Sequence, residues 1–123
     1  ISTDVCVPIS RLADCILASA QEARDSGIAH FLVGHVGDGN FHFGYLIDPH
    51  SQAERELAES LNDKMVRRAQ SMGGTCTGEH GIGMHKMGFL KEEAGDQALD
   101  WMRAIKRTLD PKNILNPGKI FYL

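Results

Sequence analysis

Two histidines, His35 and His42, flank a glycine-rich turn in this 123-residue chain, in the segment His-Val-Gly-Asp-Gly-Asn-Phe-His. Apolar residues lead into the turn over about 28–36 and out of it over about 41–47, which is typical of two strands joined by a tight turn. Residues opposite each other in an antiparallel pair have Cβ atoms about 5 Å apart on one side of the sheet. The two imidazoles are therefore expected to face each other and to reach one metal ion, with nitrogens about 2 Å from it.

A second glycine-rich segment, Gly78–Gly83, contains Glu79 and His80. Two histidines and one carboxylate form a metal set that leaves coordination positions open for substrate. We therefore expect Glu79 to be the third ligand. Cys76, three residues before Glu79, is a candidate to border the metal site. His80 is expected to act as a general base, because a free imidazole titrates at about pH 6.5. The structural alternative is that Glu79 and His80 only cap backbone groups.

The hydrophobic periodicity predicts the order β-α-β-β-α-β followed by a helix. We expect Ser10 to cap the first helix and Ser51 with Glu54 to form a capping box at the second. In the last helix, Ile105 and Leu109 are expected to point inward. The predicted fold class is α+β, a small antiparallel sheet with helices packed on one face, of the ferredoxin-like βαββαβ type. The predicted elements are strand 4–8, helix 10–25, strands 28–36 and 41–47, helix 52–72, an irregular strand 73–83, a short helix or loop within 84–94, and helix 96–109.

Composition restricts the class of protein. An apolar fraction of 42% and a charged fraction of 24% are ordinary for a globular domain, so residues 1–123 are expected to form one domain. The net charge is −3 and the longest basic run is the pair Arg67-Arg68. Nucleic acid is therefore not an expected partner. No apolar run approaches the roughly 20 residues that span a bilayer, and three cysteines without a Cys-x-x-Cys pair predict neither a disulfide framework nor a zinc knuckle.

Three motifs, in this order, resemble the C-terminal domain of FAD-linked oxidases. They are the hairpin His35–His42, the Gly78–Gly83 segment Gly-Glu-His-Gly-Ile-Gly, and the ending Asp110–Lys119, Asp-Pro-Lys-Asn-Ile-Leu-Asn-Pro-Gly-Lys. More narrowly, the chain resembles the D-lactate dehydrogenase, glycolate oxidase and D-2-hydroxyglutarate dehydrogenase branch of the vanillyl-alcohol oxidase type superfamily. The resemblance covers nearly the whole chain.

The resemblance implies a flavin-dependent D-2-hydroxy acid dehydrogenase. In such enzymes the equivalents of His35, His42 and Glu79 bind a divalent metal, zinc or manganese, and the equivalent of His80 takes the hydroxyl proton while C2 delivers hydride to FAD. Asn40 and Asn116 are implied to border the flavin. The FAD-binding domain is expected to lie N-terminal to this chain, so the chain alone is expected to be inactive.

The implied partners are a small 2-hydroxy acid and an electron acceptor, namely a cytochrome, a quinone or an electron-transfer flavoprotein. Self-association through the surfaces that meet the flavin domain is also expected. The implied compartment is the bacterial cytoplasm, peripheral to the membrane, or the mitochondrion of a eukaryote. Two alternatives stay open: a stand-alone metallohydrolase whose ion activates water, and a non-catalytic metal-binding or oligomerisation module.

Overall fold

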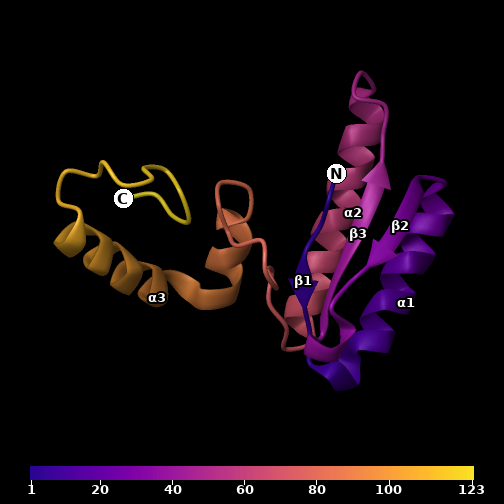
Figure 1. The fold of residues 1–123 in the computed structure, drawn as a ribbon, viewed down its shortest axis with the longest axis horizontal. Coiled ribbons are helices and arrows are strands. Elements are labelled where there is room, and N and C mark those ends of the chain that lie inside the picture. The colour runs from indigo at the N-terminus through magenta and orange to yellow at the C-terminus, as the bar shows by residue number, and fades with distance from the viewer. The chain divides into compact units, whose positions relative to one another are not determined.

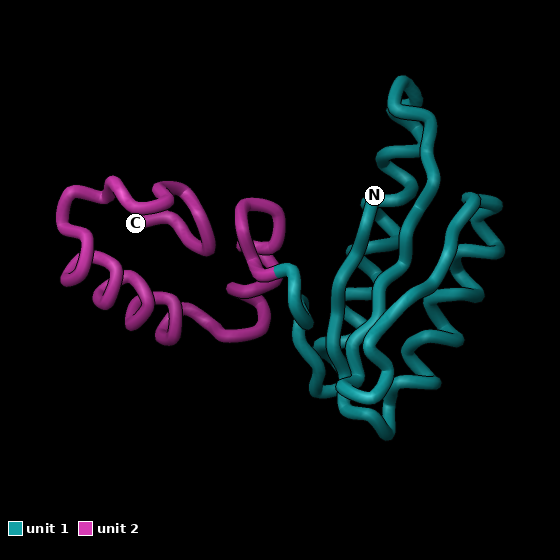
Figure 2. The backbone as a smooth tube through the Cα atoms, in the orientation of Figure 1, with its two compact units in different colours: residues 1–80 teal, residues 81–123 magenta.

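A computed structural model describes all residues from 1 to 123. The chain forms two compact units, Ile1–His80 and Gly81–Leu123 (Figure 2). The elements in chain order are β1 (Val5–Cys6), α1 (Ile9–Ser26), β2 (Ala29–Val33), a short 3-10 turn η1 (Val36–Asp38), β3 (Asn40–Leu46), α2 (Gln52–Ser71) and α3 (Met87–Leu109). None of the helices is long and apolar enough to cross a membrane.

The first unit is a three-stranded antiparallel sheet in the order β1-β3-β2, with α1 and α2 packed on one of its faces (Figure 1). This arrangement confirms the predicted α+β class. Alternate side chains of β3, namely Phe41, Phe43 and Tyr45, are buried in the core. Because neighbouring residues of a strand point to opposite faces, Asn40 and His42 belong to the other face of the sheet.

The predicted fourth strand over 73–83 is wrong. Only Thr75 makes a β-bridge, to Cys6 on the free side of β1. A full strand there would complete the spatial order of a ferredoxin-like sheet. Beyond Thr75 the backbone amides donate to a side chain instead of to a neighbouring strand, as described below, and a segment whose amides are used in this way does not extend a sheet.

The helix ends follow local chemistry, with one exception. Gly27 ends α1 in the left-handed conformation, with φ of 74°. The Ser51 hydroxyl accepts from the Glu54 amide and so caps α2 as predicted. The second half of the predicted capping box is wrong, because the Glu54 carboxylate accepts from the amide of Asp48, at 2.7 Å, and the Ser51 amide donates to the Asp48 oxygen. The prediction for α1 is wrong, because the helix begins directly after Pro8 without a side-chain cap.

In the second unit, α3 contains a break at Gly95, where φ is 78° and ψ is 167°. The break separates the predicted short helix within 84–94 from the predicted last helix. Ile105 and Leu109, expected inward, are exposed, as is Trp101 on the same side of the helix. At the end of α3 the Asp110 carboxylate accepts from two following backbone amides, which fixes the start of the C-terminal loop.

Candidate functional site

His42 lies on the central strand and is only 7% exposed. Its Nδ1 is 3.0 Å from the backbone oxygen of Thr3. A carbonyl oxygen can only accept, so Nδ1 carries the proton and Nε2 of the neutral ring has a free lone pair. This is the arrangement that orients a histidine as a metal ligand through Nε2.

His35 lies beyond the end of β2, directly before η1, and its side chain is exposed. The prediction that His35 and His42 are directly opposed is wrong, because Val33 is the cross-strand partner of His42. The chain between the two histidines turns tightly at Gly39, where φ is +76° and an added Cβ would lie 2.0 Å from the oxygen of Val7. The turn brings the two rings to a centroid distance of 6.4 Å, edge to face.

The carboxylate of Glu79 lies between these two rings. Its Oε2 is 3.5 Å from Nε2 of His35, and its Oε1 is 3.1 Å from Nε2 of His42. The ring of His80 is stacked on that of His42 at 4.8 Å with an interplanar angle of 11°, and its Nε2 is 3.6 Å from Oε1 of Glu79. The structure therefore brings together all four residues expected to carry the chemistry.

These distances fit a divalent metal ion. Ligand atoms that each lie about 2.0–2.2 Å from one ion are about 2.8–3.6 Å apart in octahedral or tetrahedral geometry. The two distances from Glu79 oxygens to histidine Nε2 atoms fall in this range. The donor set of two imidazole nitrogens and a carboxylate suits zinc, manganese and iron. A second candidate set is Asp4, His42 and His80, whose ligand atoms all lie within 4.8 Å of one another.

Asp4 is the residue that the sequence reasoning missed. Its side chain is fully buried, and its two oxygens accept hydrogen bonds from five groups. The donors are the Asn40 side-chain amide (2.8 Å), the Thr77 hydroxyl (2.8 Å) and the backbone amides of Gly78 (2.9 Å), Glu79 (3.1 Å) and His80 (2.9 Å). The available signal was a charged residue at the start of the otherwise apolar predicted strand 4–8, since a buried aspartate is rare unless its oxygens accept hydrogen bonds.

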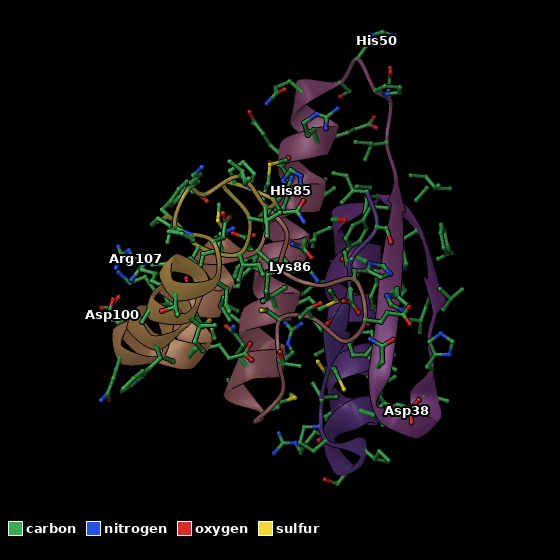
Figure 3. All side chains as sticks on the ribbon, turned by 60° about the vertical axis from the view of Figure 1, so that its left-hand side comes forward. Asp38, His50, His85, Lys86, Asp100 and Arg107 are labelled. Atoms are coloured by element: carbon green, nitrogen blue, oxygen red, sulfur yellow. The ribbon has the colours of Figure 1, made fainter.

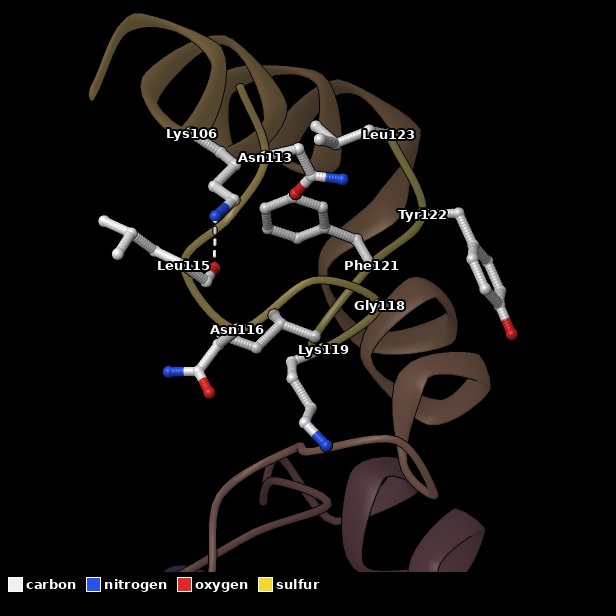
Figure 4. Close-up of a pocket in the computed structure, with 10 residues that line it drawn as sticks. Lys106, Asn113, Leu115, Asn116, Gly118, Lys119, Phe121, Tyr122 and Leu123 are labelled. Atoms are coloured by element: carbon white, nitrogen blue, oxygen red, sulfur yellow. Dashed lines mark hydrogen bonds between the residues drawn. The ribbon is translucent and has the colours of Figure 1, made fainter. Parts of the chain in front are cut away.

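Asn40 and Asn116 lie in different units. Asn40 is buried, and its amide nitrogen donates to Asp4 and to the Val5 oxygen at 2.9 Å. Its side-chain oxygen has no hydrogen-bond partner. Asn116 lies in the C-terminal loop and lines a pocket of the second unit together with Lys106 and Lys119 (Figure 4).

The remaining histidines and cysteines do not join the cluster. His50 is in the turn after β3, whereas Asp38 marks the turn before it, at the other end of the strand (Figure 3). Cys76 is fully buried among the core residues. Partial burial, and then the charges of Asp4 and Asp38, raise the pKa of Cys6. Cys6 is therefore a neutral thiol at pH 7.

A groove runs from the histidines along the open face of the sheet. It is lined by Phe31 and Val33 beside His35, His42 and Glu79. The Phe31 ring covers Gly44, where an added Cβ would lie 2.1 Å from the ring. One end of the groove is thus apolar and the other carries the candidate metal ligands, which suits a small ligand with a polar head.

The comparisons with known proteins agree with the motifs. Residues 1–120 match the family described as "FAD linked oxidases, C-terminal domain". The chain is 52% identical over 96% of its length to "D-lactate dehydrogenase [cytochrome], mitochondrial" of Arabidopsis thaliana, covering 21% of that protein. It is 50% identical over 98% of its length to the protein of the same name from Kluyveromyces lactis, covering 20% of it.

A bacterial relative extends the range of named activities. The chain is 38% identical over 96% of its length to "Glycolate oxidase subunit GlcD" of Bacillus subtilis, covering 25% of that protein. The chain thus spans about a fifth to a quarter of the length of these relatives. The match over residues 1–120 confirms the resemblance predicted from the three motifs, and the chain belongs to the family of FAD-linked oxidase C-terminal domains.

Proposed function

We propose that this chain is the metal-bearing, substrate-side domain of an FAD-dependent D-2-hydroxy acid dehydrogenase of the D-lactate or glycolate type. The observation that carries the proposal is the Glu79 carboxylate between the Nε2 atoms of His35 and His42. The substrate class is supported by the names of the relatives, which are D-lactate dehydrogenases and a glycolate oxidase subunit.

In this proposal His35, His42 and Glu79 hold a divalent metal, zinc or manganese. The hydrogen bond to Thr3 directs Nε2 of His42 toward the site. Glu79 is about half exposed, with 47% of its side chain accessible, so the ligand set is open toward the groove. When bound, the metal would polarise the hydroxyl of a 2-hydroxy acid, and FAD held by the preceding domain would supply the hydride acceptor for C2.

His80 is the proposed general base. Its ring is fixed in orientation by stacking on His42, yet 45% of the side chain is accessible from the groove. A neutral imidazole beside the ligand set is placed to take the hydroxyl proton from a substrate held there. The apolar end of the groove at Phe31 and Val33 is proposed to contact the substrate's C2 substituent.

Asn40 and Asn116 are proposed to border the flavin. The buried side-chain oxygen of Asn40 is an acceptor without a partner in the chain, which supports a role toward a bound group. Asn116 has φ of 48°, so its backbone is in the left-handed region, and it lines the C-terminal pocket.

The FAD-binding domain is proposed to precede this chain in the complete enzyme and to cover the exposed apolar side of α3 at Trp101, Ile105 and Leu109. A cytochrome, a quinone or an electron-transfer flavoprotein is proposed as the electron acceptor, the first supported by the name of the plant and yeast relatives. Those names also support a mitochondrial compartment for a eukaryotic source. Self-association of the isolated chain and a bacterial cytoplasmic compartment stay predictions.

The proposal is tested by His80→Ala in the complete enzyme, with His50→Ala as the control at the far end of β3. We expect His80→Ala to retain metal by elemental analysis and to slow reduction of FAD by D-lactate or glycolate in stopped flow by about 10²- to 10⁴-fold. His50→Ala should be reduced at the normal rate. Normal reduction of the His80 variant would remove this residue from the mechanism, and zinc-dependent hydrolysis by the chain alone would favour the metallohydrolase.

A further inference from the structure

The loop 77–80, which carries Glu79 and His80, belongs to no helix or strand. Neither residue is positioned by a ladder of backbone hydrogen bonds, and both side chains are about half exposed. A metal site, however, requires its ligands to be held within about 0.5 Å of the productive geometry. Some other group must therefore fix the loop against the histidine hairpin.

Asp4 contacts every residue of that loop. Its Oδ2 accepts from the Thr77 hydroxyl and from the consecutive amides of Gly78, Glu79 and His80, at 2.8 to 3.1 Å. The loop already packs closely against Asn40, because an added Cβ at Gly78 would lie 1.8 Å from the Asn40 amide nitrogen. The backbone at the two proposed functional residues is thus tied to one buried carboxylate.

The same carboxylate also contacts the histidine hairpin. Its Oδ1 accepts from the Asn40 amide at 2.8 Å and lies 3.6 Å from Nδ1 of His42. The two segments that supply the proposed ligands, the hairpin and the loop, are therefore joined through Asp4. Both oxygens of Asp4 are already used by donors of the protein, which argues against Asp4 as a direct ligand in the second donor set.

We propose that Asp4 is the positioning residue of the site: its buried carboxylate sets the placement of Glu79 and His80 relative to His42. This inference rests on the proposed function. Removal of a group that orients a metal ligand typically weakens metal affinity by about 10- to 100-fold. Asp4→Asn keeps the shape of the side chain but replaces one acceptor oxygen with a donor that faces the loop amides.

The test uses the 123-residue chain with Zn²⁺ as the probe, together with amide hydrogen exchange in the metal-free chain. Asp38→Asn is the matched control, because Asp38 is an exposed carboxylate in the turn of the histidine hairpin and the substitution removes the same charge (Figure 3). We expect Asp4→Asn to bind Zn²⁺ about 10- to 100-fold more weakly, and its amides at 78–80 to exchange faster, with the amides of β3 still protected. Asp38→Asn should change neither quantity by as much as threefold, about 0.7 kcal/mol.

Thr77→Val provides a second variant if Asp4→Asn does not fold. It removes one neutral donor to Asp4 and leaves the carboxylate in place, so Zn²⁺ affinity is expected to fall by about three- to tenfold. Unchanged affinity, or unchanged exchange at 78–80, in a folded Asp4 variant would overturn the proposal. Loss of Zn²⁺ binding with these amides still protected would identify Asp4 as a ligand and also overturn it.

Failure of the proposed function gives a different result. A wild-type chain that binds no Zn²⁺ would refute the metal site itself. In that case exchange at 78–80 in the metal-free chain still decides whether Asp4 anchors the loop.

Discussion

The turn that joins the two histidines gives the sharpest test of the hairpin geometry. Gly39→Ala places a Cβ on a residue with φ of +76°, 2.0 Å from the oxygen of Val7. The left-handed backbone costs about 1–2 kcal/mol for a residue other than glycine. The Val7 amide donates to the Gly39 oxygen at 3.0 Å, and loss of this bond adds about 0.5–1.5 kcal/mol. The expected loss in free energy of unfolding is therefore about 1.5–3.5 kcal/mol.

Gly37→Ala is the matched control in the same turn, because nothing lies within 4 Å of an added Cβ and its φ is not positive. Its effect should stay within about 0.5 kcal/mol. The assay is urea unfolding followed by the amide NMR signals of β3, since the only tryptophan, Trp101, lies in the second unit. Equal stability of the two variants would refute the described turn.

Three further predictions follow from the described contacts. Gly44→Ala should destabilise the first unit less than Gly39→Ala in the same urea assay, because the three atoms nearest its Cβ all belong to the ring of Phe31, a half-exposed side chain that can rotate away. The hydrogen bond from Lys106 lowers the pKa of Asp110 to about 2. The stabilisation by the ionised Asp110 carboxylate is therefore complete above about pH 4 and is lost as the pH falls toward 2. A carboxyl NMR titration checks this, because the Asp110 titration midpoint should be higher in Lys106→Met than in the wild type. Burial raises the pKa of Tyr45 to about 12. The free energy of unfolding should therefore be independent of this phenol up to pH 10 and fall between pH 10 and 12. A phenolate absorbance signal from Tyr45 at pH 10.5 in the folded chain would contradict this prediction.

Local signals in the sequence predicted what local chemistry determines. The Gly-Asp-Gly-Asn turn and the Ser51 cap each depend on residues close in sequence, and each is present in the structure. The histidines and Glu79 were predictable as a set because their residue types are those of metal ligands. The family match over 1–120 agrees with the motifs that suggested it.

The errors have both distant and local causes, and a local one is the predicted Ser10 cap, since the helix begins directly after Pro8. Nothing near residue 77 predicts that its loop will bond to Asp4, more than 70 residues away, in place of forming a strand. The prediction that His35 and His42 are directly opposed was wrong because the 3-10 turn η1 contains residues that would otherwise extend the two strands of the hairpin. Ile105 and Leu109 are exposed because periodicity identifies an apolar side of a helix but not what covers it.

The most direct test of the central claim is Zn²⁺ binding by the purified chain, measured by calorimetry and elemental analysis beside Glu79→Gln and the double variant His35→Ala/His42→Ala. The account predicts one Zn²⁺ per wild-type chain, no binding by the double variant and strongly weakened binding by Glu79→Gln. Zinc retained by the double variant, or affinity unchanged by Glu79→Gln, would contradict the claim that these three side chains form the metal site.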